Sequence, residues 1–171
     1  MLSSQQQTTP FVHTKGEGTH IWFTNSLLTI KAAAEDTDGR FSLIEQLAPP
    51  GYETPYHVHH GEGHELFYVI EGTFTFYYGE ESVRGTAGTT VSLPTGIPHG
   101  YRVEGDAPAR ILIQISRPEL AGFFVEGGEP AEEPVLPDPT EPDIEALVEL
   151  SERYDMEILG RLPDGGGSGQ S

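Results

Sequence analysis

The sequence predicts an all-β protein, and three observations support this fold class. First, eight short segments rich in β-branched and aromatic residues follow one another between about residues 19 and 116, each bounded by turn residues. Second, the chain contains 21 glycines and 14 prolines, which suits a protein with many tight turns better than a helical bundle. Third, strict alternation within these segments gives each of them two faces. Many short strands at this spacing indicate a sandwich or a barrel.

The expected strands can be placed by residue number. They cover His20–Thr24, Leu27–Ala33, Arg40–Ala48, Glu65–Glu71, Thr73–Tyr78, Thr89–Leu93, His99–Val103 and Ala109–Ser116. In the fifth of these, the alternation places Phe74, Phe76 and Tyr78 on one face of the strand.

The character of the chain changes after the last strand. The pattern Ser116-Arg-Pro-Glu119 is typical of a capping box and predicts a short helix over Glu119–Val125. Residues 126–142 contain five prolines and six acidic residues, so we expect an extended surface connection there. A second helix should begin at Thr140–Asp143 and dock on the barrel or on a partner, because it is too short to be stable alone. Its apolar face would consist of Ile144, Leu147, Val148, Ser151 and Tyr154.

The length of 171 residues suits one domain with a core of its own. We therefore expect a flexible N-terminal arm at 1–18, the barrel at 19–116, and C-terminal helices with an acidic, proline-rich connection at 117–159. The glycine-rich tail at 160–171 should be disordered.

The charge of the chain excludes several classes of partner. There are 27 acidic and 9 basic side chains, giving a net charge of −18 that repels phosphate backbones and anionic lipids. We therefore expect neither nucleic acid nor a membrane as a partner. Only two of the basic residues are lysines (Lys15 and Lys31), which resembles the composition of halophile proteins. An ordinary acidic surface is the alternative explanation.

Two absences from the sequence also constrain the chemistry. No apolar run approaches the roughly 18–20 residues of a membrane span, and the N-terminus lacks the pattern of a secretory signal, so we expect a cytoplasmic protein. The chain contains no cysteine, which excludes disulfides and thiolate ligands. Any metal site must therefore use histidine and carboxylate side chains.

Histidines cluster in one short segment of the chain. Four of the seven, His57, His59, His60 and His64, lie within eight residues, and a fifth, His99, follows Pro94-Thr-Gly-Ile-Pro. A His-x-His pair on a strand sends both imidazoles to the same face. Together with a carboxylate and a remote third imidazole, they form a three-nitrogen, one-oxygen site that suits Fe, Mn, Ni, Cu or Zn and leaves positions open.

These residues resemble the two motifs of the cupin family. The first motif, G-x5-H-x-H-x3–4-E-x6-G, is matched by Gly51, His57, His59, Glu65 and Gly72. The second, G-x5-P-x-G-x2-H-x3-N, is matched by Gly88, Pro94, Gly96 and His99. The resemblance covers roughly residues 40–116, and both motifs occur in order. It implies a jelly-roll β-barrel with His57, His59, Glu65 and His99 as ligands of one divalent transition metal.

The chain departs from these motifs at two places. Five residues separate His59 from Glu65, one more than the family pattern allows. We still prefer Glu65 to Glu62 as the ligand, because only Glu65 keeps six residues before Gly72. The second departure is Val103, which stands where the second motif ends in Asn. This replacement puts a polar contact in the barrel mouth in doubt.

The alternation of side chains along a strand predicts which residues lie beside the metal. Phe67 and Val69 lie on the same face of their strand as Glu65, and Tyr101 lies on the same face as His99. For these three residues the alternatives are barrel core and substrate contact. Arg102 would be a surface charge or a partner for an anionic substrate. Each of the two extra histidines, His60 and His64, is either a solvated turn residue or an acid or base beside the metal.

The resemblance extends to small single-domain cupins related to quercetin 2,3-dioxygenases, which also carry a helical extension after the barrel. It implies a dioxygenase-type oxidoreductase acting on a small aromatic or enol-bearing substrate, in which Glu65 ligates the metal and accepts a proton from a substrate hydroxyl. A metal-dependent isomerase, epimerase or decarboxylase is one alternative, and a non-enzymatic cupin that binds a small molecule is another. Because cupin barrels commonly pair through sheet edges, we also expect a homodimer.

Overall fold

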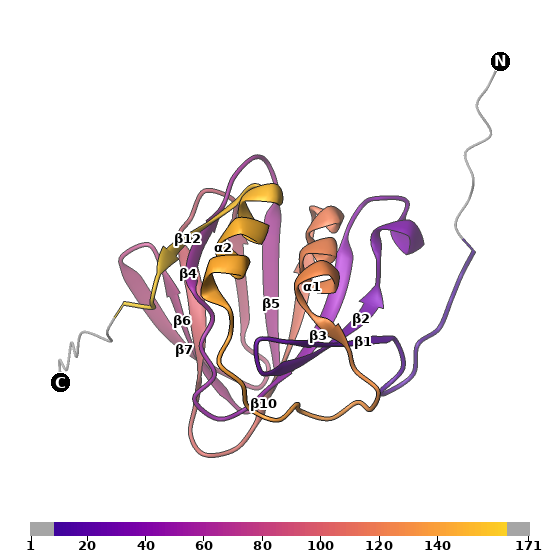
Figure 1. The fold of residues 1–171 in the computed structure, drawn as a ribbon, viewed down its shortest axis with the longest axis horizontal. Helices are drawn as coiled ribbons and strands as arrows, with labels where there is room; N and C mark the ends of the chain where they lie inside the picture. The colour runs from indigo at the N-terminus through magenta and orange to yellow at the C-terminus, as the bar shows by residue number, and fades with distance from the viewer. Residues whose placement is uncertain (1–8, 164–171) are drawn as a thin grey trace.

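The computed structural model of the protein describes residues 9–163 and consists mainly of antiparallel strands (Figure 1). The strands are β1 (Thr19–Phe23), β2 (Ser26–Ala32), β3 (Ser42–Ala48), β4 (Tyr56–His59), β5 (His64–Glu71), β6 (Thr73–Tyr78), β7 (Glu81–Thr86), β8 (Thr90–Pro94), β9 (His99–Glu104), β10 (Ala109–Ile115), β11 (Glu129–Pro130) and β12 (Met156–Gly160). They form a seven-stranded sheet of order β11-β1-β2-β3-β10-β5-β8 and a five-stranded sheet of order β12-β4-β9-β6-β7. The all-β prediction is confirmed, and the architecture is a jelly-roll β-barrel.

The residues that alternate along the predicted strands also alternate between buried and less buried positions in the sheets. In β10, every second residue from Ala109 to Ile115 is buried. The inward-facing aromatic residues Phe67, Phe74 and Phe76 are each at most 2% exposed and meet between the two sheets. In β6 the expected face of Phe74 and Phe76 is buried, but Tyr77 on the opposite face is buried as well. The core therefore lies between the sheets.

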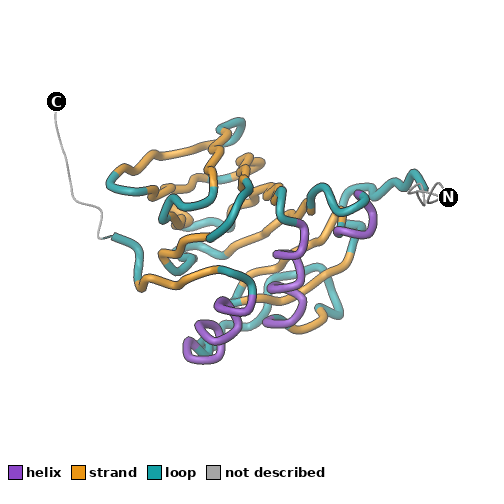
Figure 2. The backbone as a smooth tube through the Cα atoms, turned by 90° about the horizontal axis from the view of Figure 1, so that it is seen from above, coloured by secondary structure: helices purple, strands orange, loops and turns teal. Residues whose placement is uncertain are grey.

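The helices lie to one side of the strands (Figure 2). A short 3-10 helix, η1 (Ala34–Thr37), connects β2 to β3, and η2 (Pro118–Leu120) leads directly into α1 (Ala121–Gly127). The second helix, α2 (Ile144–Arg153), begins where the Asp143 carboxylate accepts a hydrogen bond from the Ala146 backbone N–H at 3.0 Å. It packs against both α1 and β12.

Two expectations about these helices are wrong. Ser116 does not cap the first helix, because its hydroxyl accepts a hydrogen bond from the His64 backbone N–H at 2.8 Å, which joins the end of β10 to the start of β5. Ile144 does not belong to the buried face of α2. It is 55% exposed, whereas Leu147, Leu150 and Ser151 face the interior. The spacing of the apolar residues correctly predicted the helix. The predicted buried face, however, began too near the N-terminus of the helix.

The C-terminal strand β12 is an element that the sequence analysis did not anticipate. It pairs antiparallel with β4, so that Met156 lies opposite His59 and Ile158 lies opposite His57. A backbone hydrogen bond from His60 N–H to the Asp155 carbonyl, at 2.8 Å, continues the connection. The end of the described chain therefore forms the outer edge of the sheet that carries the histidines.

The N-terminal segment before β1 contacts the barrel. The Lys31 ammonium on β2 donates to the backbone carbonyls of Thr14, at 2.9 Å, and Glu17, at 2.6 Å. The expected arm at 1–18 and the expected tail at 160–171 lie partly outside residues 9–163. Within those residues, no helix is both long and apolar enough to span a bilayer.

Candidate metal centre

Four side chains from three strands converge between the two sheets. His57 and His59 come from β4 and His99 from β9, all in the five-stranded sheet, whereas Glu65 is the second residue of β5 in the seven-stranded sheet. Each offers one potential ligand atom, and these atoms lie within 4.8 Å of one another. The sequence-predicted ligand set is therefore brought together in space, and it could hold a metal ion.

Local strand geometry explains how the three imidazoles meet. His57 and His59 are two residues apart on β4 and so share a face. His57 is paired in register with His99 on the neighbouring strand β9. The ring centroids of His57 and His59 are 5.0 Å apart, and those of His57 and His99 are 4.4 Å apart.

Backbone carbonyls orient two of the imidazoles. His57 Nδ1 lies 2.9 Å from the Pro55 carbonyl oxygen, and His99 Nδ1 lies 2.8 Å from that of Ile97. Because a carbonyl oxygen only accepts, Nδ1 carries the proton in both rings. Each neutral ring then directs the lone pair of its Nε2 towards the cluster. Such hydrogen bonds fix the tautomer and orientation of metal-binding histidines.

Glu65 is the only carboxylate of the described cluster. Its Oε2 lies 3.0 Å from His99 Nε2, which donates to it when the His99 ring carries both protons, and 3.1 Å from His59 Nε2. Burial alone would raise the pKa of Glu65, but the imidazoles of His59 and His99 outweigh this effect and hold the pKa well below its usual range. The carboxylate is therefore ionised at neutral pH. No hydrogen bond within residues 9–163 engages its other oxygen, Oε1.

The two carbonyl-oriented histidines differ in their proton affinity. Burial, together with the neighbouring imidazoles of His99 and His59, lowers the pKa of His57 to about 3. Burial also opposes protonation of His99, but the adjacent Glu65 carboxylate raises the pKa of His99 above its ordinary value. At neutral pH, His57 is thus an uncharged donor, whereas His99 holds a proton more strongly.

The arrangement of His59 tests whether the cluster fits a metal ion. Both of its ring nitrogens are buried, and neither has a hydrogen-bond partner in residues 9–163, since the 3.1 Å approach to Glu65 lacks hydrogen-bond geometry. Buried polar atoms without partners are costly, and they are rare in folded proteins unless water or an ion satisfies them. Three imidazole nitrogens and one carboxylate oxygen suit Fe, Mn, Ni, Cu or Zn. The residues present therefore fit a divalent transition metal.

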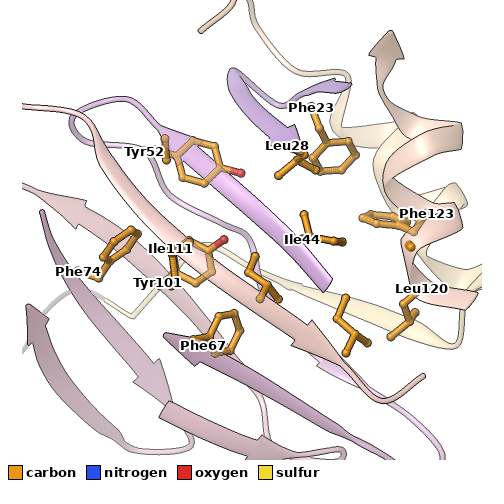
Figure 3. Packing of buried hydrophobic residues seen from close by; sticks show 14 of the residues in the cluster. Phe23, Leu28, Ile44, Tyr52, Phe67, Phe74, Tyr101, Ile111, Leu120 and Phe123 are labelled. Carbon is orange, nitrogen blue, oxygen red and sulfur yellow. The ribbon is translucent and has the colours of Figure 1, made fainter. Parts of the chain in front are cut away.

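The cluster lies at one end of an apolar chamber of about 70 Å³. His57, His59 and Glu65 form part of its wall, and Phe67 and Tyr101 lie beside them. The rest of its lining includes residues from the N-terminal and C-terminal elements, namely Phe23, Leu120, Phe123, Leu147 and Met156. Figure 3 shows Phe123 and Leu120 on the helix facing the strands that carry Phe67 and Tyr101. The helical extension thus covers the side of the barrel where the cluster opens.

The remaining residues nominated from the sequence lie at different distances from this chamber. Phe67 and Tyr101 line the chamber, whereas Val69 is fully buried beside Ile111 in the sheet and does not. Arg102 points away from Tyr101: its guanidinium donates to Glu53, at 2.5 Å, and to the Tyr77 hydroxyl, at 3.1 Å.

The two extra histidines lie in different surroundings. His60 Nε2 lies 3.2 Å from a Glu157 carboxylate oxygen on β12, and His64 is exposed at the start of β5. His64 lines a small recess of about 10 Å³ that reaches His59, Glu65 and His99 from the other side. Val103, in place of the motif Asn, is fully buried in the core opposite Phe74.

The sequence analysis missed a line of buried polar groups on the chamber wall. The Tyr101 hydroxyl donates to Gln46 Oε1, and Gln46 Nε2 donates to the Ser26 hydroxyl at 2.8 Å. The Tyr52 and Thr24 hydroxyls form a separate pair at 2.9 Å. A glutamine at an inward position of β3, between Ile44 and Ala48, was the available signal, because a buried amide needs partners.

Comparisons with known proteins support the architecture. Residues 44–115 match the model of the cupin domain family. Among curated proteins, the chain is 28% identical over 153 residues to quercetin 2,3-dioxygenase of Bacillus subtilis, a match covering 88% of this chain and 44% of that protein. It is 31% identical over 71 residues to an uncharacterised protein of Methanocaldococcus jannaschii, covering 42% of this chain and 56% of that protein. The chain spans about half the length of the curated relatives it matches.

Two solved structures show the same fold. One is a protein of Thermotoga maritima described as a predicted oxalate decarboxylase, with a TM-score of 0.58 and 21% identity, covering 63% of this chain and 99% of that one. The other is the polyketide cyclase RemF of Streptomyces resistomycificus, with a TM-score of 0.51 and 22% identity, covering 63% of this chain and 79% of that one. At these identities the likeness concerns the fold alone.

Proposed function

Because residues 44–115 match the cupin domain family, we propose that the protein is a metal-dependent oxidoreductase of the dioxygenase type, acting on a small aromatic or enol-bearing substrate. The observation that carries this proposal is the convergence of His57, His59, Glu65 and His99 at the end of an apolar chamber. The likeness to a quercetin 2,3-dioxygenase favours this chemistry over the other reactions that cupin folds host.

A divalent transition metal held by these four residues would supply Lewis acidity and electron-transfer capacity to an oxygen-bearing substrate. The protein's own contribution is orientation. The Pro55 and Ile97 carbonyls hold the His57 and His99 rings in one orientation, which leaves Nε2 of each facing the ligand cluster. The ionised Glu65 is positioned to accept the proton of a substrate hydroxyl through its Oε1 atom, which no hydrogen bond within the described residues engages.

The chamber wall suits this reaction in two respects. Its apolar side chains, among them Phe67, Leu120 and Phe123, exclude water and offer surfaces on which a flat ring can pack. The Tyr101 hydroxyl, which donates its proton to Gln46 Oε1, can accept a hydrogen bond from a second hydroxyl of the substrate. In the proposed reaction both atoms of dioxygen enter the substrate, which itself supplies the four electrons, so no external reductant is required.

Oxygen uptake tests the proposal. Protein loaded with Fe(II) or Mn(II) and given a flavonol should consume oxygen, and His59→Ala should abolish consumption while the fold remains, because the core does not depend on that ring. His60→Ala is the matched control: this histidine is tied to Glu157 outside the chamber and should retain the activity. Zinc as the sole native metal, with no uptake on any phenolic, would instead support a Lewis-acid isomerase, epimerase or decarboxylase.

A further inference from the structure

The chamber at the four ligands is too small to hold a flat, multi-ring substrate by itself. Its volume of about 70 Å³ corresponds to roughly two water molecules at about 30 Å³ each. Pockets that bury a drug-sized ligand are typically about 300–1,000 Å³. A substrate whose reacting oxygen reaches the ligands must therefore extend out of the chamber.

A second hollow, the outer groove, directly adjoins the chamber. It has a volume of about 770 Å³ and lies between residues 49–55, residues 136–144 and the end of β12. Six residues line both hollows: Thr24, Tyr52, Thr54, Pro55, Leu147 and Ile158. Because these residues are shared, the chamber and the outer groove meet at this junction.

The outer groove has the surface chemistry of a site for a flat apolar body. Its walls include six prolines, Pro49, Pro50, Pro55, Pro137, Pro139 and Pro142, which offer rigid apolar faces without N–H donors. Ile144 lines the groove although it is 55% exposed, so folding alone gives no reason for an isoleucine there. The Glu53 carboxylate at the groove is engaged by Arg102 at 2.5 Å.

A neighbouring hollow of about 930 Å³ suits this role less well. It shares two residues with the chamber, Thr24 and Leu147, where the outer groove shares six, and it is lined by acidic side chains such as Glu129, Glu132 and Glu133. It adjoins the outer groove through Thr24, Asn25, Leu136, Pro137, Pro142 and Leu147.

The junction is formed by side chains with defined positions. Tyr52 is 8% exposed, and its hydroxyl is fixed 2.9 Å from that of Thr24. Leu147, on the buried face of α2, is also 8% exposed. Figure 3 shows the Tyr52 and Tyr101 hydroxyls directed towards the side of the barrel that the C-terminal helix covers. A ligand passing from the outer groove to the four ligand residues therefore meets Tyr52 and Leu147.

We propose that the substrate spans both hollows, with an oxygen-bearing head in the chamber and a flat apolar body in the outer groove, and that Tyr52 and Leu147 set the size of body accepted. This inference rests on the proposed function and adds the site of the substrate's distal part. It assigns the connection at residues 136–144 a role in substrate selection.

Two probes that share a head but differ in body test this inference. Quercetin is a flavonol, and maltol carries the same 3-hydroxy-4-keto head without the aryl rings. Their dissociation constants are measured by absorbance on metal-loaded protein, for the wild type, Leu147→Trp and Ile144→Trp. Both substitutions fill the outer groove or its junction, so quercetin binding should weaken about tenfold or more (about 1.4 kcal/mol) and maltol binding should remain within about twofold.

Val83→Trp is the control, because Val83 lies on β7, is 37% exposed and lines neither hollow. It should leave both dissociation constants unchanged. Ile144 is exposed, so its variant should fold even if the buried Leu147→Trp does not, and melting curves verify both. Unchanged quercetin binding in the folded variants, or equal weakening of both probes, would overturn the outer-groove site and leave the proposed function standing. Failure of the wild type to bind either probe would overturn both.

Discussion

His57 on β4 and His99 on β9 are direct partners across an antiparallel ladder, with their ring centroids 4.4 Å apart. The pairing places two imidazoles from distant parts of the sequence side by side. Their Nδ1 atoms both donate to a carbonyl two residues earlier in the chain, at Pro55 and Ile97. This repeated local arrangement orients the metal-facing nitrogens before any metal arrives.

Removal of one ligand should release the metal. Glu65→Ala and His99→Ala should each lower the metal content of the purified protein by about an order of magnitude, because each removes one of four donor atoms. Elemental analysis of protein purified without added metal measures this. His64→Ala, an exposed histidine that begins the same strand as Glu65, should retain the metal. Full metal in both ligand variants would refute the site.

Metal binding should weaken as the pH falls. Metal binding requires deprotonated ligands, and His99 has a raised pKa because Glu65 stabilises its charged form. His57, with a pKa of about 3, and the ionised Glu65 need not lose a proton near neutrality. Below the pKa of His99, the apparent affinity should therefore fall about tenfold per pH unit, with about one proton released per metal. Chelator competition between pH 5.5 and 7.5 measures this, and a flat profile would contradict it.

The Tyr101 hydroxyl should contribute to stability. Tyr101→Phe leaves the buried Gln46 carbonyl oxygen without its donor, which should lower the free energy of unfolding by about 1–3 kcal/mol. Chemical denaturation measures the change. Tyr78→Phe is the matched control, since Tyr78 is only partly buried and its hydroxyl forms no hydrogen bond within residues 9–163. Equal stability of the two variants would show that the buried pair contributes nothing.

The net charge of −18 should make stability depend on salt. Self-repulsion among the acidic side chains is screened as the Debye length falls from roughly 10 Å at 0.1 M salt to roughly 3 Å at 1 M. The melting temperature should therefore rise between dilute buffer and molar sodium chloride. A melting temperature that does not change with salt would contradict the halophile interpretation of the composition. It would support the alternative, an ordinary acidic surface.

The protein should be a homodimer in solution. The outer strands β7 and β8 end their sheets and leave backbone groups without a neighbouring strand in the described chain, which favours pairing with a second copy. The N-terminal segment and the helix at 142–155 are the other expected contact elements. Light scattering at working salt concentration should give twice the mass of 18.6 kDa. A monomeric mass over the full concentration range would exclude the dimer.

The sequence by itself determined the strands and the faces of their residues. Period-two alternation is a local property, so it correctly placed Phe67, Val69 and Tyr101 inward. The spacing of the two histidine motifs likewise nominated the four side chains that converge, even with an extra residue in the turn before Glu65. Local spacing was enough for His57 and His59, because both lie on the single strand β4, whereas Glu65 on β5 and His99 on β9 were nominated by the resemblance to the two motifs.

Only the tertiary structure decided which distant segments meet. Periodicity specifies a face but not a partner, so it could not show that β12 pairs with β4 or that Gln46 receives the Tyr101 hydrogen bond. The hydroxyl of Ser116 could accept a hydrogen bond either from the start of the following helix or from a distant backbone N–H. In the structure it accepts from the backbone N–H of His64. The junction between the chamber and the outer groove arises in the same way, because α2 contacts α1 and also β12, which pairs with the distant strand β4.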